Sequence, residues 1–216
     1  MHFLDNIRKA KPSHSVSEKI LATLGILVLG IILGVFAKYL DVHQAKLPNF
    51  MARVDQFLDF HNFLGGFAPW ILIAICIAVY SRTQIRAAIN VFAFFLGMVA
   101  SYYLYCYFAA GFFPKDYAMN WIVLTMLSPI FGFVCWYGKG RGVAAVMISA
   151  LALAVLFNCA FGYGWSYISV KRWLNVLMYA IGVGVLYRKA REMEGMIALS
   201  IVFAILLNLF LPVKFW

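Results

Sequence analysis

The chain has 216 residues, of which 65% are hydrophobic and 12% are charged, and its mean hydropathy is +0.88. An average soluble domain is less apolar and carries about twice that charged fraction. The composition therefore excludes an ordinary soluble domain and predicts an integral membrane protein. The net charge of +10 does not indicate nucleic-acid binding, because the basic residues lie in short loops beside apolar segments. There they set orientation and meet anionic lipid, which makes membrane lipid the expected partner.

A helix needs about 17 to 25 predominantly apolar residues to cross the hydrocarbon core of a bilayer. The sequence predicts a cytoplasmic basic tail over residues 1–19 and a single transmembrane domain over residues 20–216. The fold class is predicted to be an all-α polytopic membrane protein with seven transmembrane helices. These are expected at about residues 20–40, 63–80, 87–109, 120–137, 143–165, 173–187 and 196–212. The first is expected to stay as a signal anchor, because no small-residue cleavage site follows it.

The basic residues predict that the N-terminus is inside and the C-terminus outside, in the plasma membrane. With this orientation eleven Lys and Arg residues lie inside and seven outside, as the positive-inside rule requires. The inner set is Arg8, Lys9, Lys11, Lys19, Arg82, Arg86, Lys139, Arg141, Arg188, Lys189 and Arg191. The outer set is Lys38, Lys46, Arg53, Lys115, Lys171, Arg172 and Lys214.

Three segments share a pattern that starts with a tyrosine in an inner loop, at Tyr80, Tyr137 and Tyr187. A small residue follows thirteen positions later, and two further small or polar residues follow at four-residue spacing, which places them on one helix face. The sets are Ala93, Gly97 and Ser101; Ala150, Ala154 and Asn158; and Ser200, Ala204 and Asn208, while the first span carries Gly30, Gly34 and Lys38. Small residues on one face let helices approach closely in lipid.

This pattern predicts an internal repeat: one helix followed by three helical hairpins of the same orientation. The predicted positions for helix packing or for a membrane-protein partner are Gly30, Gly34, Gly97, Ala154 and Ala204. The alternative is that the chain has no repeat and that these residues coincide by chance, because small residues are common in any apolar helix.

Polar and aromatic residues gather near the predicted outer ends of the helices. Ser101, Asn158 and Asn208 lie about 20 residues beyond the tyrosines, or roughly 30 Å along a helix. They predict an outward-facing cup for a small organic solute with a flat or cationic part, lined by Ser101, Tyr105, Asn120, Trp121, Asn158, Trp165 and Asn208. The alternative is that these groups only join helices by hydrogen bonds.

The outer segment over residues 41–62 holds the densest polar chemistry. Its periodicity over residues 49–62 predicts one amphipathic helix on the outer surface, with Asp55, Asp59 and His61 as a candidate lid. Carboxylate and imidazole groups at this spacing can share a metal ion, but no recognised ligand spacing is present. The four cysteines are widely separated, so neither a metal nor a cofactor is expected.

Apart from Lys38, the predicted spans contain no ionisable residue of the kind that proton relays and intramembrane hydrolases need. An enzyme is therefore not favoured. The first hypothesis is a small transport-related protein that captures an organic solute, alone or as the substrate-binding subunit of a larger transporter. Its architecture is similar to that of small substrate-capturing subunits that dock on an energised module, although those commonly have six spans. The alternative is a non-transporting interaction subunit for assembly, immunity or regulation, which binds a partner through the small-residue faces.

Overall fold

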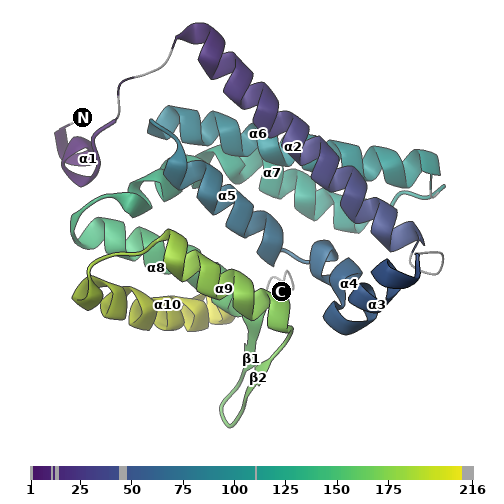
Figure 1. The fold of residues 1–216 in the computed structure, drawn as a ribbon. Coiled ribbons are helices and arrows are strands. Elements are labelled where there is room, and N and C mark those ends of the chain that lie inside the picture. The colour runs from purple at the N-terminus through teal and green to yellow at the C-terminus, as the bar shows by residue number, and fades with distance from the viewer. Residues whose placement is uncertain (1, 11, 13–14, 44–47, 110, 211–216) are drawn as a thin grey trace.

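The computed structural model describes residues 2–10, 12, 15–43, 48–109 and 111–210, and the structural statements below concern these residues. The chain is mainly helical and has one short β hairpin (Figure 1). The elements are α1 (His2–Ile7), α2 (Val16–His43), α3 (Asn49–Leu58), α4 (Phe60–Gly65), α5 (Ala68–Tyr80), α6 (Gln84–Ala109), α7 (Lys115–Trp136), the 3-10 turn η2 (Tyr137–Lys139), α8 (Gly142–Ala160), β1 (Phe161–Tyr163), β2 (Ile168–Val170), α9 (Trp173–Val185) and α10 (Ala190–Phe210).

Five helical segments are long and apolar enough to cross a membrane: α2, α6, α7 together with η2, α8 and α10. The helices α5 and α9 are also apolar, but each has 13 residues, or about 20 Å of helix, against a hydrocarbon core of about 30 Å. The expectation of an all-α membrane protein is therefore confirmed in outline. The number of crossings and the orientation stay predictions, and residues 211–216, which include the expected outer C-terminus, lie outside the described part of the chain.

Helix α5 lies between two groups of helices (Figure 1). It contacts α6 and α7 on one side and α8 and α9 on the other. Its buried side chains include Trp70, Leu72, Ile75 and Val79. The helix is short because Gly65 and Gly66 interrupt the apolar run, so the predicted span over residues 63–80 divides into the end of α4 and the whole of α5.

The pairing of α2 with α6 is the most extensive contact between two described helices. Gly30 and Gly34 on α2 lie directly against the backbone of α6, and Gly97 on α6 lies against the backbone of α2 at Leu27 and Ile31. A Cβ atom at any of these glycines would collide with the neighbouring helix. The close approach lets the Ser101 hydroxyl donate across the pair to the carbonyl of Ile31, at 3.1 Å.

The pairing of α8 with α10 uses the other two small-residue faces. Ala150, Ala154, Ser200 and Ala204 are all fully buried, and Ala154 and Ala204 share one apolar cluster. The Asn158 amide donates to the backbone oxygen of Ala204 at 3.1 Å. The faces of Gly30 and of Ala154 are thus both covered by another helix of the same chain.

The two ends of the bundle differ in chemistry. At one end, α5 and α7 finish while α2, α6, α8 and α10 begin; we call it the arginine end. Arg8 donates there to Val79 O and Trp136 O, and Arg188 donates to Gly138 O and Gly140 O. Such carbonyls at helix C-termini lack partners within the helix and favour cations. We call the opposite end, which carries α3, α4 and the β hairpin, the hairpin end.

Two segments at the hairpin end differ from the sequence prediction. The amphipathic helix expected over residues 49–62 is broken at Asp59, which has left-handed backbone angles (φ 52°, ψ 46°) that Asp tolerates better than most residues. The span expected over residues 143–165 ends as a helix at Ala160, and the chain continues into β1, which pairs antiparallel with β2. Trp165 therefore lies in the turn of this hairpin, fully exposed, instead of at the end of a transmembrane helix.

Candidate functional site

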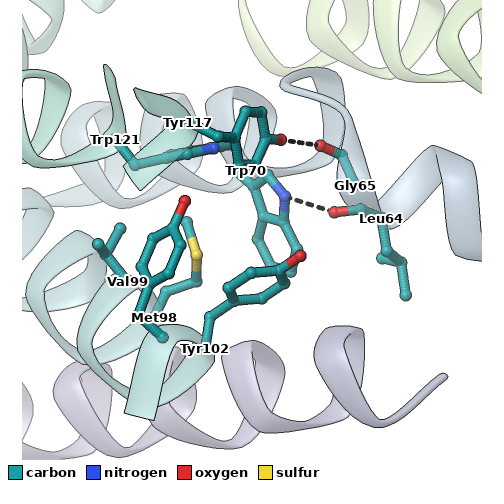
Figure 2. A pocket seen from close by; sticks show the side chains of 9 residues that line it. Leu64, Gly65, Trp70, Met98, Val99, Tyr102, Tyr117 and Trp121 are labelled. Atoms are coloured by element: carbon teal, nitrogen blue, oxygen red, sulfur yellow. Dashed lines mark hydrogen bonds between the residues drawn. The ribbon is translucent and has the colours of Figure 1, made fainter. Parts of the chain in front are cut away.

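An aromatic pocket lies at the hairpin end, where α4 joins α5 and where α6 and α7 pack together. Figure 2 shows the aromatic rings of Trp70, Tyr102, Tyr117 and Trp121 converging on it. The full lining is Leu64, Gly65, Trp70, Met98, Val99, Tyr102, Tyr103, Tyr117 and Trp121. We call this set the aromatic pocket.

The end of α4 fixes two of these rings. Trp70 donates its indole N–H to Leu64 O at 2.9 Å, and Tyr117 donates its hydroxyl to Gly65 O at 2.7 Å (Figure 2). Both acceptors are carbonyls at a helix C-terminus, which have no partner within the helix. The hydrogen bonds therefore tie α5 and α7 to the short helix α4.

Trp121 is 4% exposed and forms the wall of the pocket on the α7 side. Its ring stacks on Phe67 with 4.4 Å between centroids and 6° between planes. Tyr117, one helical turn earlier, meets the same ring edge to face at 6.4 Å. Aromatic contacts of this kind add about 0.5–1.5 kcal/mol beyond simple burial, so the wall is held in place before any ligand is present.

The Tyr103 hydroxyl is a buried polar atom of the pocket whose bonding is incomplete. The side chain is 7% exposed, and its hydroxyl oxygen is buried without a hydrogen-bond partner among the described residues. Leaving such a group unsatisfied costs about 1–3 kcal/mol. The free space in the pocket is about 10 Å³ for the centre of a water molecule, which is room for about one water or one polar atom of a ligand.

Lys38 lies beside Tyr102 and is 4% exposed, which is unusual for a lysine. Its ammonium nitrogen is 2.6 Å from Asp41 and 5.3 Å from the Tyr102 ring centroid, with the Phe112 ring at 5.0 Å. The ion pair keeps the neighbourhood of Tyr102 close to neutral overall. The sequence analysis noted Lys38 for its position in a span, and the structure adds its contact with the pocket aromatics.

The structure divides the residues of the predicted cup between different places. Trp121 lines the aromatic pocket, and Ser101 lies behind it in the contact of α6 with α2. Tyr105 is partly buried on α6, whereas Asn120 is exposed on α7. Neither of these two lines the pocket.

The remaining amides of the predicted cup lie where α8, α10 and the β hairpin meet. Asn158 is 1% exposed, donates to Ala204 O, and accepts from the Tyr163 hydroxyl at 2.6 Å. Burial raises the pKa of Tyr163, and a side-chain hydrogen bond with Asn208 partly offsets this rise. Lys171 donates to Asn158 O at 3.0 Å, and burial lowers the pKa of Lys171. Both ends of the Asn158 amide are therefore used within the chain.

The candidate lid residues form two main interactions, and His61 links them because its Nε2 lies 3.9 Å from Asp59 Oδ1. The Asp55 carboxylate accepts from the backbone N–H of His61 at 2.8 Å, and its Oδ2 lies 2.9 Å from Nδ1 of the same histidine. Asp59 pairs with Arg172, just before α9, with 2.9 Å between Oδ2 and Nε. The ion pair between Asp59 and Arg172 links the α3–α4 segment to the start of α9.

Sequence reasoning did not select most of the aromatic pocket. Tyr117 lies just before the predicted span over residues 120–137 and Trp70 lies in the outer half of the span over residues 63–80, and aromatic residues near the membrane interface are common in any membrane protein. The adjacent pair Tyr102 and Tyr103 was the available signal. Only the fold brings these rings to the end of α4.

The described residues contain no group of three or more His, Cys, Asp or Glu side chains placed to hold a metal ion. A comparison of the chain with known protein families, curated proteins and solved structures finds no match. The class that the fold defines is an all-α membrane protein.

Proposed function

We propose that this protein captures a small organic solute in the aromatic pocket, from the outer side of the plasma membrane, alone or as the substrate-binding subunit of a larger transporter. The buried Tyr103 hydroxyl carries the proposal, because it is a hydrogen-bonding group in a mainly aromatic pocket and has no partner among the described residues. A polar atom of the solute completes its bonding, and one water takes that place when the solute is absent.

The neighbourhood favours a flat, uncharged solute. Trp70, Tyr102 and Trp121 offer ring faces and edges for stacking. The ammonium of Lys38 lies over the Tyr102 ring, 5.3 Å from its centroid, and so already occupies a ring face on which a cationic solute would stack. The sequence analysis allowed a solute with either a flat or a cationic part, and the position of Lys38 favours a flat solute.

The pocket as it stands holds only about one water, so a ring can enter only if one wall moves. We expect the α3–α4 segment to be the wall that moves. Its end is held against the pocket by the hydrogen bonds that Trp70 and Tyr117 donate to Leu64 O and Gly65 O. For α4 to move away from α5 and α7, these two hydrogen bonds must break and the buried side chains of Phe63 and Leu64 must leave the core. The segment then acts as a lid, and the pair between Asp59 and Arg172 holds it closed.

The alternative role as an interaction subunit loses its proposed surface. It relied on the groove of Gly30 and Gly34, and α6 fills that groove.

Thermal unfolding tests the proposal, because a ligand that binds only the folded state raises the unfolding midpoint. The protein is washed exhaustively in fresh detergent, and a small-molecule extract of host cells is then added. We expect the extract to raise the midpoint of wild type and to leave Tyr103→Phe and Trp121→Ala unchanged. An equal rise in all three proteins, or no rise in wild type, would contradict the proposal.

A further inference from the structure

A second cavity lies at the arginine end, between the start of α2, the end of α5 and the start of α6. Its polar lining is Glu18, Lys19, Tyr80, Ser81, Arg82, Thr83, Arg86 and Asn90. Its free volume is about 320 Å³, compared with about 10 Å³ in the aromatic pocket. This space is enough for a phosphate group together with part of the molecule that carries it.

Arg86 brings into this cavity a positive charge that no described residue neutralises. Its Nη2 donates to Lys19 O at 2.6 Å, to the Thr23 hydroxyl, and weakly to Asn90 Oδ1 at 3.4 Å. All of these acceptors are uncharged, and Nε and Nη1 have no partner among the described residues. Partly buried charges are normally paired, so one side of the guanidinium is available to an anion.

The other charged groups of the cavity are also mainly cationic. Arg82 donates from Nη1 to Pro12 O at 3.0 Å, and Lys19 has no ion pair in the described part of the chain. The acidic residue is Glu18, whose carboxylate accepts from the backbone N–H of Ser15 at 3.1 Å at the start of α2. The lining therefore holds three cations and one carboxylate.

We propose that this cavity binds a phosphate group. Guanidinium groups suit phosphate because their planar N–H pairs match two oxygens of the anion. Arg86 and Arg82 supply such groups, and the Thr83 hydroxyl, which accepts from the backbone N–H of Arg86 at 3.2 Å, has its proton available to donate. This inference is independent of the proposed solute site, which lies at the opposite end of the bundle.

Two sources can provide a phosphate at this position. The cavity has an apolar side formed by Ala22, Ile26 and Ile77, which suits the glycerol and acyl chains of an anionic phospholipid. Free phosphate or a soluble phosphorylated compound would use the cationic side alone. The chemistry of recognition is the same for both sources.

Binding is measured on the full chain in a neutral detergent at constant ionic strength, because salt screens charge interactions. One probe is inorganic phosphate, compared with chloride. The other is dilauroyl phosphatidylglycerol, compared with the matching diacylglycerol, which lacks phosphate. The variants are Arg86→Gln and Arg82→Gln, and the matched control is Arg141→Gln, which removes an exposed charge at the same end but outside the cavity.

We expect at least one phosphate probe to bind more tightly than its comparison compound, and each cavity variant to weaken it about tenfold. Arg141→Gln should bind as wild type does. Binding of the lipid alone identifies a headgroup site, and binding of inorganic phosphate identifies a site for soluble phosphates. Arg82 is exposed, so Arg82→Gln keeps the test valid if Arg86→Gln fails to fold. The inference is overturned if neither probe exceeds its comparison compound, or if Arg141→Gln weakens binding as much as the cavity variants do.

Discussion

Two tyrosines show how the same hydroxyl group can have opposite effects on stability. The Tyr103 hydroxyl is buried without a described partner, whereas the Tyr163 hydroxyl donates to the buried Asn158. An unsatisfied buried group is costly, and a satisfied one stabilises the fold. The comparison between them therefore distinguishes a hydroxyl that we assign to the proposed solute from one that stabilises the fold.

For the solute-free protein, we expect Tyr103→Phe to raise the free energy of unfolding by about 1 kcal/mol or to leave it unchanged. Tyr163→Phe should lower it by about 1 kcal/mol, because it leaves Asn158 Oδ1 without its donor. The measurement is reversible unfolding in mixed detergent micelles. A clear loss of stability in Tyr103→Phe would show that its hydroxyl is bonded within the protein.

Asn158 itself is expected to act as a structural residue. Removing its amide in Asn158→Ala deletes the hydrogen bond to Ala204 O and leaves the Tyr163 hydroxyl without its acceptor. Hydrogen bonds between membrane helices contribute about 0.6 kcal/mol each on average, so we expect a loss of about 1 kcal/mol in unfolding free energy. The effect of the solute on the unfolding midpoint should persist, and its disappearance would place Asn158 in the solute site.

At the scale of helices, the small-residue faces are the places where helices pack closely. The four-residue spacing of Gly30 with Gly34, and of Ala150 with Ala154, placed these residues on one face from sequence alone. The pairing could not be predicted, because all four faces carry similar small residues and any two of them could pack. The α2–α6 and α8–α10 pairs depend on contacts between segments far apart in the chain.

The short elements at the hairpin end could not be predicted from the sequence either. The apolar periodicity continues through Asp59, so nothing in it marks the left-handed residue that separates α3 from α4. The β hairpin is made of apolar and aromatic residues that also suit the end of a transmembrane helix. Hydropathy predicts the long helices well, because lipid imposes a length and a composition on them, and it says less about segments outside that environment.

The α2–α6 contact can be tested with two glycines on the same helix. A leucine in Gly30→Leu would collide with the backbone of α6 at Phe94, which cannot move aside as a side chain can. We expect a loss of about 3 kcal/mol or more in unfolding free energy. Gly25→Leu is the matched control, since nothing lies within 4 Å of a Cβ atom there. Equal effects of the two changes would contradict the observed pairing.

At the scale of the whole molecule, the charges predict orientation. Arg8, Arg86 and Arg188 all insert at the arginine end, and the positive-inside rule places that end in the cytoplasm. A membrane-impermeant thiol reagent should label Arg53→Cys but not Arg141→Cys in intact cells. The four native cysteines are buried or partly buried, so the signal belongs to the introduced residue. Labelling of Arg141→Cys alone would reverse the orientation.

The proposed lid is also tested at this scale, because the pair between Asp59 and Arg172 joins the α3–α4 segment to the start of α9. Both side chains are partly exposed, at 45% and 38%, and pairs of this kind contribute about 0.2–1 kcal/mol. Arg172→Gln should therefore release bound solute up to about fivefold faster. Lys115→Gln, which removes an exposed charge at the same end, is the control. Release rates that do not differ between these two variants would argue against a lid.

The claim that the aromatic pocket holds a solute is tested most directly by native mass spectrometry of protein purified gently from the host's own membranes. We predict that the wild-type spectrum contains a small bound mass that dissociates on collisional activation. The same mass should be present in Tyr163→Phe and absent from Tyr103→Phe. A wild-type spectrum without a small bound mass, or a mass retained equally in Tyr103→Phe, would contradict the account.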